Sequence, residues 1–200
     1  MEMMGTVAFA ASGAMLGIRK KMDLFGVCVL GVTTSVGGGA IRDVTLGIIP
    51  PGMFRRPIYT IVAVMGSLGL FALLYIRRNL LDGRIGQLYD LLMNISDAIG
   101  LGIFTVVGIN TAWKAGYHQL FLLGVITGIG GGILRDIMAG VTPYVLKKHI
   151  YACASIIGAL VCVYTKSTLG NLTAMMVGAS AVVIVRFLAM HYRWNLPRIE

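Results

Sequence analysis

The stretch GVTTSVGGGAIRDVTLGIIP at residues 31–50 recurs in altered form as GVITGIGGGILRDIMAGVTP at residues 124–143. The two stretches are identical at ten of twenty positions, at a constant offset of 93. Each carries three consecutive glycines, then Arg-Asp, then a glycine and a proline. Glycine commonly terminates a helix and proline cannot continue one cheaply, so we interpret the last two as stops. The repetition predicts two structural halves that are built alike.

The sequence around these stretches is strongly apolar. Of the 200 residues, 57% are hydrophobic and only 12% are charged, and the mean hydropathy is +0.84. Apolar runs near the about 18 residues that cross a bilayer recur along the whole length. The formal net charge of +9 sits in short clusters between these runs, which is typical of topology signals and contact with anionic lipid rather than nucleic acid. The composition predicts a small integral membrane protein.

The predicted fold class is an all-α integral membrane protein with seven transmembrane helices. Period-two alternation, which would indicate a membrane β-barrel, is absent from the sequence. We interpret the first apolar run as a span that stays rather than a signal peptide, because its charges follow it. The expected spans are about 3–18, 24–48, 57–76, 87–110, 118–141, 149–166 and 171–191.

The order of the spans predicts an inverted repeat. The second glycine stretch begins three spans after the first, and an odd number of crossings reverses the chain direction. We therefore expect one transmembrane domain over residues 1–200, with repeat 1 at about 3–76, repeat 2 at about 87–166 and an extra helix at about 171–191.

The basic residues between the spans predict the orientation. An outside N-terminus and a cytoplasmic C-terminus place ten basic residues inside and four outside, which fits a multi-pass protein of the inner (plasma) membrane. The ten are Arg19, Lys20, Lys21, Arg77, Arg78, Arg84, Lys147, Lys148, Arg193 and Arg198. The four are Arg55, Arg56, Lys114 and Lys166.

The glycine triplets are the first candidate site. Three glycines weaken a helix by about 1 kcal/mol each relative to alanine and leave nearly a full turn without side chains. We expect the second and fifth spans to be broken there and to line a pore or gate, as broken helices do beside membrane cavities. Close helix packing is the alternative. The candidate pore residues are Gly37, Gly38, Gly39, Gly130, Gly131 and Gly132, with the hydroxyls of Thr34, Ser35 and Thr127 as ion ligands.

Arg42 and Arg135 follow the triplets. Ionisable residues within a span are costly, so they usually face a cavity or a partner, although snorkelling to the headgroups is the alternative. The inverted order places one arginine near each mouth of a central region. Asp43 and Asp136 come directly after them and point about 100° away around the helix, so we do not expect simple pairing between neighbours.

Better partners for the arginines lie on the fourth span. Asp90, Asn94 and Asp97 fall at i, i+4 and i+7 and share one helical face. We expect an Arg135–Asp97 or an Arg186–Asp90 contact. At the offset of 93, position 4, opposite Asp97, is methionine, so the acidic stripe is expected in repeat 2 alone.

Other chemistry finds little support in the sequence. Three cysteines and three histidines are scattered among apolar runs or far apart, so we expect no metal site and no disulfide framework. No nucleophile and base stand out together within the spans, so we expect neither an enzyme nor a cofactor.

The quoted motifs resemble a known family. GGGAIRDVTLGIIP (37–50) and GGGILRDIMAGVTP (130–143), with FAASGAMLGIRKKMDLFG (9–26) and DAIGLGIFTVVG (97–108), look like the prokaryotic trimeric intracellular cation (TRIC) channels and the related bacterial proteins called glycine transporters. The resemblance implies seven helices as an inverted 3+3 repeat plus one, and a homotrimer with one pore per protomer. It also implies that the triplets kink the second and fifth helices, and that Arg42 and Arg135 help form the permeation path and gate.

Three functions remain open at this point. The first is a monovalent-cation channel, with potassium as the expected ion, in which hydroxyls, carbonyls and the acids of the fourth span replace hydration water. The second is a carrier for a small zwitterion such as glycine, whose carboxylate suits the arginines. The third is a membrane scaffold that transports nothing. Membrane lipids are partners in each case.

Overall fold

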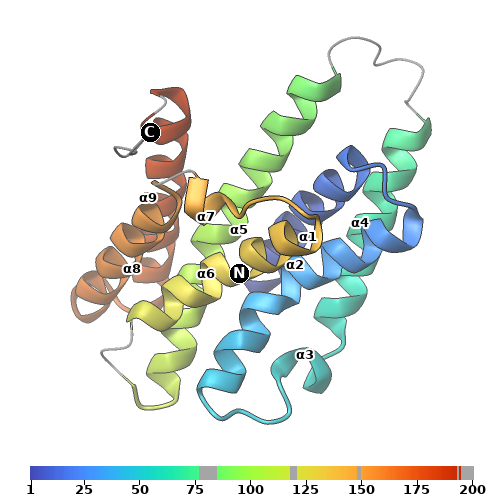
Figure 1. Ribbon diagram of the computed structural model, residues 1–200. Helices are drawn as coiled ribbons and strands as arrows, with labels where there is room; N and C mark the ends of the chain where they lie inside the picture. Colours follow the sequence, from blue (N-terminus) through green and yellow to red (C-terminus); the bar gives the residue numbers. More distant parts are fainter. Residues whose placement is uncertain (77–84, 118–120, 148–149, 193, 195–200) are drawn as a thin grey trace.

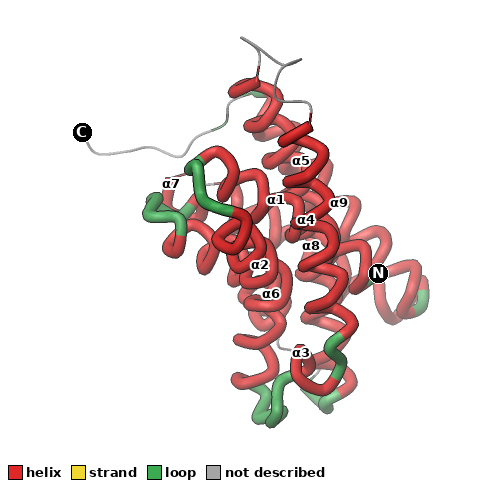
Figure 2. The backbone as a smooth tube through the Cα atoms, turned by 90° about the vertical axis from the view of Figure 1, so that its right-hand side faces the viewer, coloured by secondary structure: helices red, strands yellow, loops and turns green. Residues whose placement is uncertain are grey.

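The computed structural model describes residues 1–76, 85–117, 121–147, 150–192 and 194, and all of its regular secondary structure in these ranges is helical (Figures 1 and 2). The helices are α1 (Glu2–Arg19), α2 (Leu24–Thr45), α3 (Gly52–Arg55), α4 (Ile58–Ile76), α5 (Ile85–Lys114), α6 (Phe121–Met138), α7 (Tyr144–Lys147), α8 (Ile150–Leu169) and α9 (Asn171–His191). Six of the basic residues that predict the orientation lie outside these ranges: Arg77, Arg78, Arg84, Lys148, Arg193 and Arg198. The predicted starts of two spans, at residues 118 and 149, also lie outside them.

Within the residues that the structure describes, six helices are long and apolar enough to cross a membrane: α2, α4, α5 from Tyr89, α6, α8 and α9. The chain is therefore a multi-pass membrane protein. The first predicted span forms helix α1 but is not among the six. Its Glu2, Thr6, Ser12 and Arg19 lower its hydropathy, and it packs against α2, α4 and α5, with Ala10 and Ala14 fully buried. Because α1 faces protein along so much of its length, it needs less apolar surface than a lipid-facing helix.

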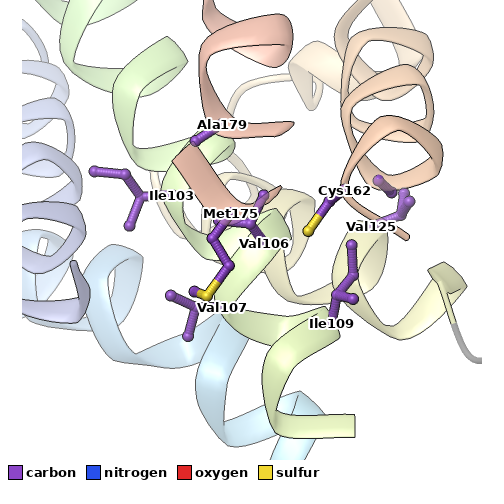
Figure 3. Close-up of a cluster of buried hydrophobic side chains, with 9 residues drawn as sticks. Ile103, Val106, Val107, Ile109, Val125, Cys162, Met175 and Ala179 are labelled. Atoms are coloured by element: carbon purple, nitrogen blue, oxygen red, sulfur yellow. The ribbon is translucent and has the colours of Figure 1, made fainter. Parts of the chain in front are cut away.

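Helices α1, α2, α5 and α6 form the centre of the bundle. Helix α4 covers α1 and α2 on one side, and α8 and α9 cover α6 and α5 on the other (Figure 1). A cluster of apolar side chains from α5, α6, α8 and α9 joins this second side, including Val106, Val125, Cys162 and Met175 (Figure 3). The core therefore lies where the four central helices meet their outer helices.

The predicted breaks at the glycine triplets are absent. Helices α2 and α6 continue without interruption through residues 37–39 and 130–132. The middle glycines, Gly38 and Gly131, instead serve close helix packing, because they allow the backbones of α2 and α6 to cross. A Cβ on Gly38 would lie 2.1 Å from the Thr127 carbonyl oxygen, and a Cβ on Gly131 would lie 2.2 Å from that of Thr34. The helix–helix contact at this crossing offsets the low helix propensity of glycine.

The predicted stops are present at the ends of α2 and α6. Gly47 has φ +70° and Gly140 has φ +64°, the left-handed conformation that ends a helix. The next amide donates back five residues in each case, from Ile48 to the Asp43 carbonyl at 2.8 Å and from Val141 to the Asp136 carbonyl at 2.9 Å. This bonding satisfies carbonyls that a helix end would otherwise leave free.

The contacts of the first half (α1 to α4) and the second half (α5 to α8) correspond pair by pair. Gly5 lies against Phe104 and Gly100 lies against Phe9, while Gly13 approaches the Thr34 hydroxyl as Gly108 approaches that of Thr127. These pairs relate α1 to α5 by an offset of 95, whereas α2 and α6 keep the offset of 93. The short helices α3 and α7, which follow α2 and α6, lie toward opposite ends of the bundle in both views (Figures 1 and 2).

Candidate functional site

Four charged side chains form a buried charge cluster in the second half: Asp97, Arg135, Asp136 and Arg186. None is more than 2% exposed. Arg135 Nη1 lies 2.6 Å from Asp97 Oδ1, which is the ion pair that the sequence analysis considered. Arg135 Nε donates to Asp136 Oδ1 at 2.9 Å. Two cations and two anions make the cluster formally neutral, which is the condition under which charges are tolerated in a protein interior.

Uncharged side chains complete the surroundings of Arg135. Its Nη1 also donates to the Ser12 hydroxyl of α1, and the guanidinium lies 5.5 Å from the centre of the Tyr144 ring. Burial raises the pKa of the Tyr144 hydroxyl, so this group stays neutral at physiological pH. Tyr151 donates to the same Asp97 oxygen at 3.3 Å. Asp97 therefore receives both a cation and a phenol on Oδ1.

Arg186 of α9 is held less well. Its Nη2 lies 3.8 Å from Asp97 Oδ2, and its guanidinium lies 4.7 Å from the centre of the Tyr151 ring. Among the described residues, four buried side-chain atoms have no hydrogen-bond partner: Asp97 Oδ2, one nitrogen of Arg135 (Nη2) and two of Arg186 (Nε and Nη2). Such groups carry a desolvation cost, so Arg186 contributes less to the cluster than Arg135 does.

Three expectations about charge pairing need correction. Arg186 pairs with Asp97 rather than Asp90, and Asp90 pairs instead with Arg19 on the surface. Arg42 and Arg135 each pair with the aspartate that follows: Arg42 Nη2 lies 2.7 Å from Asp43 Oδ1, and Arg135 Nη2 lies 2.9 Å from Asp136 Oδ1. The long arginine side chain reaches around the helix to a neighbour whose Cα is only about 3.8 Å away. Asn94 lies half-buried on α5.

Both aspartates also fix the chain that follows. Asp43 Oδ2 accepts from the Gly52 amide at 2.6 Å, and Asp136 Oδ2 accepts from the Tyr144 amide at 2.8 Å. Gly52 and Tyr144 are the first residues of α3 and α7. The repeated Arg-Asp motif therefore joins the ends of α2 and α6 to the short helices that follow them, α3 and α7. The bond to the amide also turns each carboxylate toward its arginine.

The first half contains a cavity of about 260 Å³, here called the Glu2 cavity. The charged residues that line it are Glu2, Arg42, Asp43, Arg55 and Arg56, and Thr6, Ser35, Gly39, Tyr59 and Phe104 are among its other lining residues. Tyr59 donates its hydroxyl proton to Glu2 Oε2. Arg42 thus borders an open space, whereas its counterpart Arg135 is sealed.

Two phenylalanines lie between this cavity and the buried charge cluster. Phe104 lines the cavity and stacks on Phe9, with ring centroids 5.2 Å apart. Phe9 in turn lies against Gly100 and Gly131, one helical turn from Asp97 and Arg135. The two rings form an apolar contact between the charged regions of the two halves.

The predicted hydroxyls are divided between two surroundings. Thr34 and Thr127 are fully buried and donate to the carbonyls of Leu30 and Leu123 at 2.6 Å each. Ser35 lines the Glu2 cavity. Gly39 also lines it, whereas Gly37 lies against Leu134 and Gly130 against Ile41. The structure therefore brings Ser35, Gly39 and Arg42 together and leaves the remaining glycines and threonines in helix packing.

Sequence reasoning missed Glu2, Ser12, Tyr59 and Tyr151. The dipeptide Ile-Tyr at 58–59 recurs at 150–151, and each tyrosine bonds to a carboxylate. At the offset of 95, Glu2 stands opposite Asp97. The acidic position is therefore matched in both halves, contrary to the expectation drawn from the offset of 93.

The chain has the fold of the TRIC cation channels. A TRIC channel structure solved to explain cation conductance is 35% identical, with a TM-score of 0.82 over 100% of this chain and 95% of that one. A prokaryotic TRIC channel in 0.5 M KCl is 32% identical, with a TM-score of 0.86 over 98% and 96%. The TRIC orthologue from Rhodobacter sphaeroides is 30% identical, with a TM-score of 0.86 over 96% of each chain.

Sequence comparison gives the family itself. The family described as "Glycine transporter" matches residues 1–75 and 94–167. The UPF0126 inner membrane protein YadS of Escherichia coli (strain K12) is 37% identical over 98% of this chain and 93% of its own length. The UPF0126 membrane protein YvgT of Bacillus subtilis (strain 168) is 33% identical over 98% and 94%. The chain belongs to this family of membrane proteins.

Proposed function

We propose that the protein is a monovalent-cation channel, with potassium as the permeant ion. The observation that carries this proposal is the likeness of the whole chain to TRIC cation channels at 30–35% identity. The geometry supports it, because a charged cavity in one half and a buried charge cluster in the other flank a single pair of phenylalanine rings. An apolar constriction of this kind can close a pore by excluding water.

We propose the finer features of the channel on the same likeness, and the orientation on the basic residues between the predicted spans. The protein forms a homotrimer with one pore per protomer, and its seven helices form an inverted 3+3 repeat plus α9. It lies in the inner membrane with its N-terminus outside and its C-terminus in the cytoplasm. Arg42, Arg135 and residues beside the triplets form the permeation path and gate. Native mass spectrometry tests the trimer, and cysteine labelling of each end in spheroplasts tests the orientation.

A carrier for a small zwitterion such as glycine is the second candidate. The family description favours it, and so does the Glu2 cavity, which offers Arg42 for a carboxylate and Glu2 for an ammonium group. Carriers of inverted-repeat architecture bind such substrates between their halves.

Transport by purified protein in liposomes separates the two candidates. A channel gives a potassium flux that dissipates an imposed potential and that glycine leaves unchanged. A carrier gives counterflow of labelled glycine without a potassium conductance. Protein-free vesicles of the same lipid composition provide the control for passive leak.

A further inference from the structure

The buried charge cluster contains a carboxylate–tyrosine pair that binds a cation belonging to the chain itself. Asp97 Oδ1 accepts from Tyr151 at 3.3 Å, and the guanidinium of Arg135 lies 2.6 Å from the same oxygen. A Cβ on Gly132 would lie 2.6 Å from the Tyr151 hydroxyl oxygen, so the corner is closed. In the second half, this pair of a carboxylate and a tyrosine therefore binds a guanidinium cation.

The first half repeats the pair without the guanidinium. Tyr59 donates to Glu2, its counterparts being Tyr151 and Asp97. Arg42 Nε donates to Asp43 at 2.8 Å, and no ion pair among the described residues joins Arg42 to Glu2. Among the described residues, a Cβ on Gly39 would have only Arg42 Nη2 as a near neighbour, at 3.8 Å. Arg42, the counterpart of Arg135, thus lines the Glu2 cavity but pairs with Asp43 rather than with Glu2.

The hydroxyl groups along the wall of this cavity present oxygen lone pairs rather than protons. Thr6 donates to the Glu2 carbonyl at 3.0 Å. Ser35 has two carbonyl acceptors, Gly31 at 2.8 Å and Thr6 at 3.0 Å. Tyr59 donates to the Glu2 carboxylate. Because each proton is directed to a protein acceptor, the oxygens that remain suit a cation, which needs ligands to replace its hydration water.

The arginines around the cavity do not remove its preference for a cation. Arg42 lies 2.7 Å from Asp43 and is neutralised by it. Arg55 and Arg56 are exposed at the rim. Arg55 donates to the Ile49 carbonyl at 2.8 Å, and Arg56 lies beside the Tyr59 hydroxyl. Solvent and salt screen exposed charges over about 8–10 Å. Glu2 is therefore the charged group of the inner wall that has no cationic partner at bonding distance among the described residues.

We propose that the Glu2 cavity is a binding site for a monovalent cation, which is held by the Glu2 carboxylate with the Tyr59 and Ser35 oxygens. The bound ion has the role toward Glu2 that the Arg135 guanidinium has toward Asp97 in the second half. As a station for the permeant ion, the site rests on the proposed channel function, but its occupancy by a cation is measured separately from transport.

Crystals of the full-length protein soaked in thallium(I) salt test the site directly, because thallium(I) replaces potassium and scatters anomalously. We expect an anomalous peak in the cavity beside Glu2. Potassium titrations at constant ionic strength, with choline as the replacement, should raise the melting temperature of the purified protein. Glu2→Gln should weaken this potassium effect roughly tenfold or more, since it removes the charge that binds the ion. Tyr59→Phe should weaken it less, because the carboxylate remains.

Asp90→Asn provides the matched control, because Asp90 forms an exposed ion pair with Arg19 outside the cavity. It should keep the parent's potassium effect. An absent thallium peak, or an unchanged potassium effect in folded Glu2→Gln protein, would overturn the proposal. Stabilisation by glycine or acetate that Arg42→Gln abolishes would instead identify a carboxylate site. If thallium binds but liposomes show no conductance, the site stands and the channel function fails.

Discussion

Asp97 and Arg135 form an ion pair of 2.6 Å between α5 and α6, and neither side chain is exposed. Tyr151, Ser12 and Asp136 complete its hydrogen bonds. Breaking such a pair leaves an uncompensated buried charge, so the pair ties the second half together whenever the protein is in this state. A pore through this region requires the pair to open.

Asp97→Asn should therefore destabilise the protein strongly. The variant leaves two buried arginines with a single aspartate, and losing one partner of a buried ion pair costs about 3–5 kcal/mol. Thermal melting in detergent should show a large fall in the midpoint. The exposed Asp90→Asn should change stability by only about 0–1 kcal/mol. Equal effects of the two substitutions on the melting temperature would show that the buried ion pair stabilises the protein no more than the exposed one does.

The two arginines around Asp97, Arg135 and Arg186, should differ in how much they stabilise the protein. Arg135 is bonded to Asp97, Asp136 and Ser12, whereas Arg186 stands 3.8 Å from Asp97 with two nitrogens unbonded. Methionine replaces each with an unbranched side chain that carries no charge. Arg135→Met should lower the melting temperature more than Arg186→Met does, because fewer hydrogen bonds are lost at Arg186. The reverse order would mean that α9 supplies the main partner of Asp97.

Gly38→Ala and Gly131→Ala test the crossing of α2 and α6. Each new Cβ would lie within 2.1–2.2 Å of a backbone carbonyl oxygen, and backbone cannot move aside as a flexible side chain can. Both variants should lose stability or folded yield on size-exclusion chromatography. Gly69→Ala is the matched control, because no atom of the described part of the chain lies within 4 Å of its Cβ position on α4. The control should be neutral or stabilising by up to about 1 kcal/mol.

Substitution of the phenylalanine pair should act on conduction. Phe9→Ala and Phe104→Ala remove rings that stack at 5.2 Å between the cavity and the buried charge cluster. A wider, wetter constriction should raise single-channel conductance or open probability in planar bilayers. Phe71→Ala removes a ring of similar size on α4, where Phe71 stacks on Tyr75, and should leave conduction unchanged. If all three variants conduct alike, the constriction lies elsewhere.

The sequence predicted the elements well because their signals are local. Apolar runs gave the long helices, and Gly47 and Gly140 gave the helix ends, since each depends on a few neighbouring residues. The glycine triplets were misjudged because helix propensity favours a break, whereas the deciding interaction is between Gly38 and a carbonyl oxygen on another helix. Sequence spacing along one helix cannot reveal that contact.

The candidate site was predicted only in part for a similar reason. The Arg135–Asp97 contact followed from depth and helical face. Glu2 was missed because the offset of 93 holds for α2 and α6, while α1 and α5 correspond at 95. This difference of two residues between the offsets is enough to hide the match of Glu2 with Asp97. Tyr59 and Tyr151 gave a signal in the repeated Ile-Tyr, but their role depends on a carboxylate from a distant helix.

The central claim is that the chain conducts cations, and single-channel recording of the purified protein in a planar bilayer under asymmetric KCl tests it most directly. We predict unitary currents that reverse near the potassium equilibrium potential, that glycine leaves unchanged, and that Phe9→Ala enlarges. A silent bilayer, with protein from the same preparation exchanging labelled glycine in liposomes, would contradict the claim and favour the carrier.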